Sequence, residues 1–248
     1  MSFNPILVVS GEPNSIFLEI YLKSLKKIRI KNPLILIGSK NLIKLQMNKL
    51  GLKKKIKNLD LNNIHLKKLN NQCINLININ YITSKPFEKI TSKSNDYIAE
   101  CFKTAFHIIN KYKIEKLING PIKKETFLNK KFLGLTEFIS NKFNVKENAM
   151  LIYNNKLAVC PVTTHTPLKF VTKAINRTVI INKIKIINNF YKLKLKKNPK
   201  IAVLGLNPHC ESIDKFNEDE KIVKPAIKYL IKKKMKVSGP FSADTIFL

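Results

Sequence analysis

The sequence predicts an α/β fold with a largely parallel sheet. Short apolar runs, typical of buried strands, alternate along the chain with longer segments in which apolar residues recur at helical spacing. Glycine and proline gather just after the apolar runs, although the whole chain has only 7 glycines. Strands that alternate with helices favour parallel pairing, in which the carboxyl ends of the strands meet at one edge of the sheet.

The expected strands are short. Ile6–Val9, Leu34–Ile37 and Ile201–Leu204 are continuous apolar runs, as suits strands that are buried on both faces. Asn154-Asn155 reads as a turn between two further strands. The remaining expected strands lie within residues 73–82, 116–120, 149–155 and 157–163.

The expected helices are amphipathic and longer than the strands. The clearest is Asn95–Tyr112, whose apolar residues form one continuous face. Gly51 is a typical stop signal for the helix before it. Residues 58–72 are polar and irregular, and the lysine-rich residues 192–200 indicate a linker or a solvated loop. The other expected helices are Ser15–Ile28, Leu42–Leu50, Val179–Tyr191 and Asp219–Lys234.

The length of 248 residues suits one large or two modest domains, and we expect an internal boundary near residues 120–135. No apolar stretch approaches the roughly 18 residues of a membrane span, and the N-terminus lacks the features of a signal peptide. We therefore expect a cytoplasmic protein. The 4 cysteines are far apart, which favours reduced thiols over a disulfide framework or a zinc ribbon.

The net charge of +30 raises the alternative of a nucleic-acid-binding protein. All but two of the 46 basic residues are lysines, and they are spread over the whole chain. Proteins that read bases rely on the bidentate guanidinium of arginine, whereas lysine acts as a point charge. We therefore favour a lysine-coated protein without a specific nucleic-acid partner, and keep the lysine-rich nucleic-acid-binding protein as an alternative.

Chemistry is expected in the loops that follow the strands, since ligands of parallel sheets gather there. Four of these five loops contain a glycine, which suggests positions where a side chain does not fit. A further glycine, Gly134, lies in the unusual stretch FLGLTEF. The five loops are residues 10–15, 119–125, 163–168, 205–210 and 238–245.

Two histidines, His165 and His209, each follow the end of an expected strand. Neighbouring parallel strands would bring both imidazoles to one rim of the sheet, where they could bind a divalent metal. A catalytic metal needs three protein ligands, so two histidines are one short. The alternative is that each histidine only bonds loop backbone, as we expect a structural or surface role for His65 and His107.

Other candidate residues have weaker signals. Lys123 and Lys124 stand at a probable helix start, a reasonable place to bind phosphate, although they equally suit a solvated surface. Asp244 suits a general acid or base, a neighbour of a metal, or a helix N-cap. The sequence has no Gly-rich dinucleotide fingerprint and no Walker A motif.

Taken together, the loops resemble one family. SGEP, NGPIKKE, LGLTEF, VTTHTPL, GLNPH and GPFSADTIF occur in the order and spacing of the 4-hydroxythreonine-4-phosphate dehydrogenases of pyridoxal 5′-phosphate biosynthesis. The resemblance runs from Ser10 to Phe247. It implies a two-domain fold like that of the isocitrate and isopropylmalate dehydrogenases, and a homodimer with a shared active site.

The resemblance also implies a reaction. The family oxidises and decarboxylates 4-phosphohydroxy-L-threonine to 3-amino-2-oxopropyl phosphate, with NAD and a divalent metal (Zn, Mg or Co). By resemblance, His165 and His209 match two of three metal ligands, and Thr136 matches a substrate-binding threonine.

The sequence also departs from the family pattern. Leu135 stands where the family has a substrate-binding histidine, and NSIFLE replaces a loop with two glycines and a proline. The chain ends inside a motif at Leu248, so we expect it to lack the C-terminal part that carries the third histidine. A further alternative is therefore an inactive remnant, or a relative that acts on another phosphorylated hydroxy acid.

Overall fold

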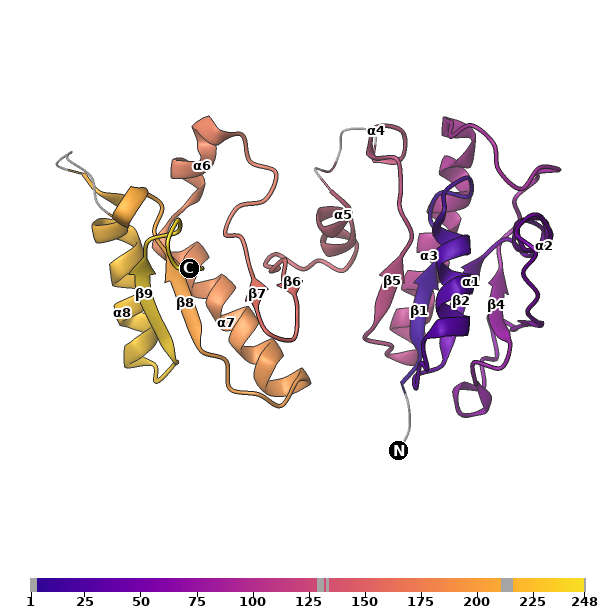
Figure 1. Ribbon diagram of the computed structural model, residues 1–248, viewed down its shortest axis with the longest axis horizontal. Helices are drawn as coiled ribbons and strands as arrows, with labels where there is room; N and C mark the ends of the chain where they lie inside the picture. The colour runs from indigo at the N-terminus through magenta and orange to yellow at the C-terminus, as the bar shows by residue number, and fades with distance from the viewer. Residues whose placement is uncertain (1–3, 129–131, 133, 211–215, 248) are drawn as a thin grey trace. The chain divides into compact units, whose positions relative to one another are not determined.

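A computed structural model describes residues 4–128, 132, 134–210 and 216–247. The chain forms two compact units, Met1–Gly134 and Leu135–Leu248. Each unit has its own sheet and its own helices (Figure 1), and they are described in turn.

The first unit contains a five-stranded parallel sheet in the order β3-β4-β2-β1-β5. In the register of the sheet, Val8 lies opposite Leu36 on one side and Ile118 on the other. The predicted α/β class and parallel pairing are confirmed in this unit. The strands are β1 (Ile6–Val9), β2 (Leu34–Gly38), β3 (Ile56–Asn58), β4 (Ile74–Asn78) and β5 (Leu117–Asn119).

Helices cover both faces of this sheet because its strands are apolar on both faces. Helices α1 (Phe17–Lys27) and α2 (Lys40–Lys49) bury Leu18, Leu22 and Ile43 in one core cluster with alternate strand residues such as Val8. Helix α3 (Asn95–Tyr112), with the bounds predicted from the sequence, contacts β1 and β2.

Two short elements of this unit were missed or only partly predicted: β3 was not expected, and for helix α4 (Lys124–Phe127) only its start near Lys123 and Lys124 was. Strand β3 carries a single half-buried apolar residue, Ile56, and pairs only with β4 along one edge of the sheet. Helix α4 is one turn long. Neither element has enough apolar residues to show a period in the sequence.

The second unit holds two small sheets. Strands β6 (Ile152–Tyr153) and β7 (Ala158–Val159) pair antiparallel, and β8 (Ile201–Leu204) pairs parallel with β9 (Val237–Phe241). The hairpin predicted around Asn154-Asn155 is present with shorter strands. The helices of this unit are α5 (Leu135–Lys142), α6 (Leu168–Ala174), α7 (Arg177–Lys194) and α8 (Lys224–Lys232).

Helices α7 and α8 pack against each other and against β9 in the core of this unit. Helix α7 begins earlier and ends later than predicted. Asn176 caps it by accepting a hydrogen bond from Val179 N (3.0 Å), and Lys192 and Lys194 suit the negative end of its dipole. The expectation of a loop over 192–200 is therefore wrong for its first residues.

The helix predicted over Asp219–Lys234 has two parts. A π-helical turn, Asp219–Val223, precedes α8, and α8 ends at Lys232. Pro225 stands in the first turn of α8, where its missing N–H is tolerated. Among the residues that the structure describes, no helix is both long and apolar enough to cross a bilayer.

Candidate active site

The first candidate region lies where the strand order of the five-stranded sheet reverses. Strand β1 is flanked by β2 on one side and by β5 on the other. The chain passes from β1 to β2, β3 and β4 on one side of β1 and then crosses to β5 on its other side. The loops after β1 and β5 are joined by backbone hydrogen bonds from Glu12 N to Pro121 O (2.8 Å) and from Gly120 N to Val9 O (2.7 Å). Such a switch point is where ligands of open α/β sheets bind.

Glycine is required where these two loops meet. Gly11 has a φ of +69°, and a Cβ there would lie 2.5 Å from Pro121 O. A Cβ on Gly120 would lie 2.2 Å from Ser10 O. Both contacts are shorter than any side chain tolerates, so the loops approach this closely only because neither residue has a side chain.

A buried tyrosine joins the ends of β1 and β2. The hydroxyl of Tyr97, from α3, shares a 2.8 Å hydrogen bond with Ser10 Oγ and accepts one from Ser39 N (3.0 Å). Burial raises the pKa of Tyr97 well above its ordinary value, so the hydroxyl keeps its proton. Sequence analysis missed this residue because it sits within the apolar face of a helix.

Glu12 is a buried carboxylate in the loop after β1, and its side chain holds that loop to the start of α3. Glu12 is 3% exposed, and it accepts hydrogen bonds from Ser94 Oγ (2.7 Å) and Asn14 N (3.3 Å). A buried carboxylate is stable only with such donors. Its position inside the SGEP motif was the available signal, but the sequence analysis assigned no role to it.

Lys123 and Lys124 lie at the start of α4, near the same switch point. Both side chains are exposed, and Lys123 Nζ is 3.9 Å from Glu125 Oε2. An exposed ion pair at that distance is weak. The two lysines contribute positive charge here and stay candidate residues for binding phosphate.

The second candidate region is the carboxyl end of the β8–β9 pair. Leu204 pairs with Phe241, and Gly205 N donates to Phe241 O (2.9 Å). Because the strands are parallel, the loops that follow them, 205–210 and 242–247, leave from the same edge. These loops carry His209 and Asp244, two of the residues predicted from the sequence.

Asp219 fixes the shape of loop 205–210. Its carboxylate is fully buried and accepts hydrogen bonds from Leu206 N (2.8 Å) and Asn207 N (3.0 Å). The side-chain amide of Asn207 donates to Asp219 (3.2 Å) and to Glu218 (3.0 Å). A Cβ on Gly205 would lie 2.5 Å from Cys210 Sγ, so a larger residue there would require the Cys210 side chain to move. Sequence analysis took Asp219 only as a helix start.

His209 and Asp244 lie within electrostatic reach of each other. A hydrogen bond from the Ser242 hydroxyl lowers the pKa of Asp244, and the charge of His209 lowers it further. His209 is exposed and has a φ of +56°. Burial raises the pKa of the neighbouring Cys210 thiol, as does the charge of Asp219, so this thiol is a poor metal ligand when protonated.

His165 is also exposed, in the segment between β7 and α6. The expectation that neighbouring parallel strands bring it beside His209 is wrong, because β7 pairs with β6 and β8 pairs with β9. Within residues 4–128, 132, 134–210 and 216–247, no three His, Cys, Asp or Glu side chains are grouped to hold a metal ion.

The substrate residue implied by the resemblance lies on α5. Leu135 is the first residue of this helix and is half-buried, and Thr136 follows it in the first turn with an exposed side chain. The Thr136 side chain is therefore accessible to a ligand, while the Leu135 side chain offers only apolar contacts. Asp244, in contrast to the helix N-cap alternative, lies in a turn after β9.

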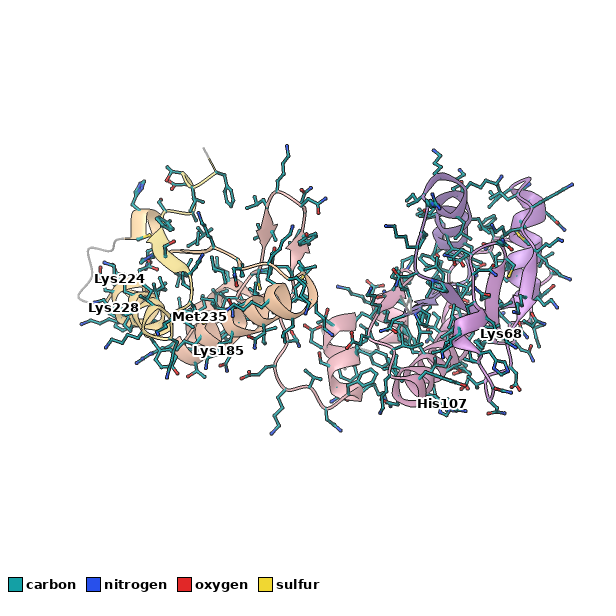
Figure 2. The ribbon with its side chains drawn as sticks, turned by 90° about the horizontal axis from the view of Figure 1, so that it is seen from below. Lys68, His107, Lys185, Lys224, Lys228 and Met235 are labelled. Atoms are coloured by element: carbon teal, nitrogen blue, oxygen red, sulfur yellow. The ribbon has the colours of Figure 1, made fainter. Side chains whose placement is uncertain are left out.

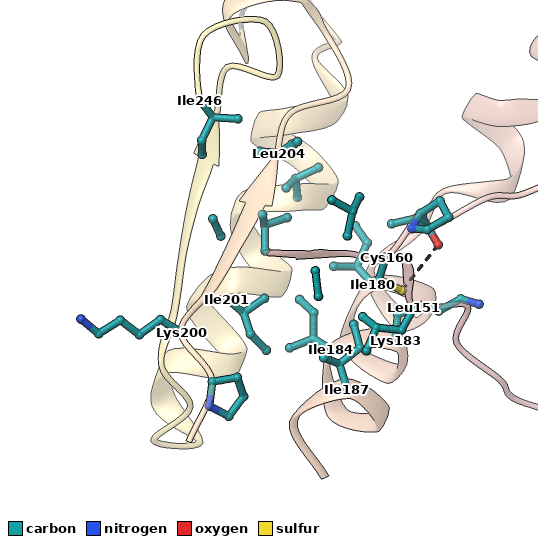
Figure 3. A pocket seen from close by; sticks show the side chains of 18 of the residues that line it. Leu151, Cys160, Ile180, Lys183, Ile184, Ile187, Lys200, Ile201, Leu204 and Ile246 are labelled. Atoms are coloured by element: carbon teal, nitrogen blue, oxygen red, sulfur yellow. Dashed lines mark hydrogen bonds between the residues drawn. The ribbon is translucent and has the colours of Figure 1, made fainter. Parts of the chain in front are cut away.

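A cavity of about 500 Å³ lies beneath the second region (Figure 3). Its walls come from β7, α7 and β8 and are mostly apolar, including Ile180, Ile184 and Leu204. Burial raises the pKa of the Cys160 thiol in its wall. Few polar groups line this cavity, so it does not suit a small, highly charged substrate.

The fold and the strand-end loops define a class: an α/β protein with a switch point in a parallel sheet and a polar cluster at the end of a second sheet. The family model described as "Pyridoxal phosphate biosynthetic protein PdxA" matches residues 29–248. The chain belongs to this family.

Named relatives agree. The chain is 32% identical over 250 residues to the 4-hydroxythreonine-4-phosphate dehydrogenase of Sulfurihydrogenibium sp., a match that covers 98% of this chain and 75% of the relative. It is 30% identical over 162 residues to the D-threonate 4-phosphate dehydrogenase of Pectobacterium atrosepticum, covering 64% and 50%. The predicted family and the predicted oxidoreductase class are confirmed.

Solved structures show the same fold. The crystal structure of 4-hydroxythreonine-4-phosphate dehydrogenase from Klebsiella pneumoniae superimposes with a TM-score of 0.80 at 25% identity. That match covers 98% of this chain and 77% of the Klebsiella chain. About a quarter of the Sulfurihydrogenibium and Klebsiella chains therefore lies outside the match.

Proposed function

We propose that the protein carries out the NAD-dependent, divalent-metal-assisted oxidation and decarboxylation of 4-phosphohydroxy-L-threonine to 3-amino-2-oxopropyl phosphate, a step of pyridoxal 5′-phosphate biosynthesis. The observation that carries the proposal is the match to relatives of that name over 98% of the chain. It is supported by the polar loops at the ends of β8 and β9, which leave the same edge of the strand pair and carry His209 and Asp244 within electrostatic reach of each other.

The described residues supply specific parts of this chemistry. We propose Asp244 as the acceptor of the substrate's hydroxyl proton because its exposed carboxylate is ionised at neutral pH; its lowered pKa makes it a weaker base than an ordinary aspartate. Thr136 offers an exposed hydroxyl for a hydrogen bond to substrate, and Lys123 and Lys124 offer positive charge for its phosphate. When bound, the nicotinamide of NAD accepts the hydride from the substrate's secondary alcohol.

The metal site is incomplete within the described residues. His165 and His209 provide two imidazoles, and a catalytic metal needs a third protein ligand that this part of the chain does not bring to them. We propose the two histidines as ligands for Zn, Mg or Co. NAD is likewise proposed from family membership, without an assigned binding residue.

D-threonate 4-phosphate is a second candidate substrate. A relative named D-threonate 4-phosphate dehydrogenase is 30% identical to this chain. Leu135, which cannot donate a hydrogen bond, stands where the resemblance implies a substrate-binding histidine. A different side chain at this position favours a different substrate. We place 4-phosphohydroxy-L-threonine first because the match to its dehydrogenase covers more of both chains.

Three further features belong to the proposal. They are a homodimer with a shared active site, a two-domain arrangement like that of the isocitrate and isopropylmalate dehydrogenases, and a cytoplasmic location. All three come from the resemblance or from the sequence and stay predictions.

The test is NADH formation by the purified chain with each of the two phosphorylated substrates, measured with and without added Zn²⁺, Mg²⁺ or Co²⁺. Because the metal site is incomplete within the described residues, we expect metal-dependent oxidation, with a higher kcat/KM for 4-phosphohydroxy-L-threonine, only when a C-terminal segment of the family that supplies the third ligand is joined to the chain. Asp244→Asn is expected to lower kcat more than KM, since it removes a proton acceptor. A higher kcat/KM for D-threonate 4-phosphate would reassign the substrate, and no NADH from either, even with that segment joined, would favour the inactive remnant.

A further inference from the structure

Helices α7 and α8 form a layer without acidic residues. Every charged side chain within the two helices is cationic, and they pack against each other. No Asp or Glu occurs between Glu147 and Glu211, or between Glu220 and Asp244. The cations of the two helices are Arg177, Lys183, Lys185, Lys192, Lys194, Lys224, Lys228 and Lys232. Three of them, Lys185, Lys224 and Lys228, are labelled in Figure 2.

Three cations of this layer surround one aromatic ring. Arg177 Cζ, Lys185 Nζ and Lys233 Nζ lie 5.5, 5.7 and 5.9 Å from the centroid of the Tyr229 ring. The three cationic side chains are exposed, and Tyr229 is half-buried. Arg177 and Lys185 come from α7, while Lys233 directly follows α8. We call Arg177, Lys185, Tyr229 and Lys233 the Tyr229 face.

The charges of the Tyr229 face are not neutralised by the protein. Within the described residues none of the three cations forms an ion pair, whereas Lys224 nearby is paired with Glu220. The π-electrons of the ring attract each cation, but the three like charges repel one another. A ligand with closely spaced negative charges would relieve that repulsion.

We propose that the Tyr229 face binds single-stranded RNA without sequence specificity. Regularly spaced phosphates match cations held around a small area, and a base can stack on the half-buried Tyr229 ring by displacing one of the exposed cations that lie over it. An acidic peptide would satisfy the charges but has no planar group to stack on Tyr229. The proposal concerns the helical layer α7–α8 and does not depend on the dehydrogenase function.

The experiment is a fluorescence-anisotropy titration of a labelled 15-nucleotide oligouridine with the full chain, repeated between 50 and 200 mM NaCl. The test variant is R177Q/K185Q/K233Q. Each phosphate contact adds roughly 0.7 to the slope of log affinity against log salt for single strands. We expect the variant to lower that slope by about 2 and to weaken binding at least about tenfold at 100 mM salt.

The matched control removes three exposed lysines from the first unit, as K53Q/K67Q/K89Q, with the same change of net charge. We expect the control to keep the slope and to lose less than about twofold in affinity, because its lysines lie outside the face. If both triple variants weaken binding equally, overall charge explains it and the Tyr229 face is not a binding site.

Two further arms separate RNA from other anions. Tyr229→Leu is expected to weaken oligouridine binding about fivefold without changing the salt slope, since it removes stacking and no charge. A poly-glutamate peptide of 15 residues is expected to bind at least about tenfold more weakly than the oligouridine, because it lacks bases to stack. Equal binding of both polymers, or an unchanged affinity in Tyr229→Leu, overturns the assignment to RNA. The single variant Lys185→Gln repeats the test, with a slope change of about 0.7, if the triple variant does not fold.

Discussion

His209 lies in a loop whose shape depends on one buried carboxylate. Asp219 accepts both backbone N–H groups that open the loop, at Leu206 and Asn207, and the side-chain amide of Asn207 as well. A carboxylate is the one side chain that accepts from several converging donors without bringing a donor of its own. The position of the imidazole therefore rests on a residue ten positions further along the chain.

Asp219→Asn is expected to destabilise the protein by about 1–3 kcal/mol, because the new NH₂ group faces N–H donors and leaves one of them unpaired. Urea unfolding followed by circular dichroism measures the change. Glu218→Gln is the matched control, since Glu218 accepts a single bond from Asn207 and is less buried. Equal losses in the two variants would mean that the burial of Asp219 does not anchor the loop.

Leu135 stands where the resemblance implies a substrate-binding histidine. We expect Leu135→His to tighten the binding of 4-phosphohydroxy-L-threonine about tenfold, because a polar substrate group left unpaired against leucine costs about 1–3 kcal/mol. Calorimetric titration of the two proteins measures the change. An unchanged or weaker affinity would show that Leu135 does not face the substrate, and Leu135→Met controls for side-chain size.

At the scale of the elements, two pairs of parallel strands build the candidate regions. Strands β1 and β5 bring the SGEP and NGP loops together, and β8 and β9 bring loop 205–210 beside Asp244. The rule that the loops after neighbouring parallel strands lie together is correct for both pairs. It is wrong for β7 and β8, because the sequence shows where a strand ends but not which strand lies beside it.

Gly120→Ala is expected to destabilise the first unit by more than about 2 kcal/mol, because its Cβ would lie 2.2 Å from a backbone oxygen that cannot move aside. The comparison variant is Gly51→Ala, which has open space around its Cβ and only the cost of a φ of +62°, about 1–2 kcal/mol. Thermal unfolding of both variants gives the ranking. A smaller loss for Gly120→Ala would mean that loops 10–15 and 119–125 separate easily.

Across the whole molecule, what the sequence revealed depended on the range of the interactions. Strands β1, β2, β4 and β5 and helix α3 follow from apolar patterns, which are local, so they were predicted well. The anchors of the candidate regions, Tyr97, Glu12 and Asp219, form bonds to residues between 12 and 87 positions away. Such long-range bonds leave no periodic signal, and they appeared only in the structure.

The candidate site followed the same division. His209 and Asp244 were identified from their loops, and the parallel pairing of β8 and β9 explains why these loops leave the same edge. His165 was identified by the same rule, yet its strand belongs to another sheet. Its role as a ligand therefore rests on the resemblance, and it needs a direct measurement.

That measurement is a calorimetric titration of zinc into the full chain and into His165→Ala, His209→Ala and His107→Ala variants. We expect the full chain to bind zinc weakly at one site, because two imidazoles do not complete a tetrahedral site. We expect His165→Ala and His209→Ala each to lose at least about tenfold in zinc affinity, or about 1.4 kcal/mol. His107→Ala, an exposed histidine on α3, should bind zinc as the unaltered chain does. If all three variants bind zinc equally well, neither His165 nor His209 is a metal ligand, and the proposed metal site is wrong.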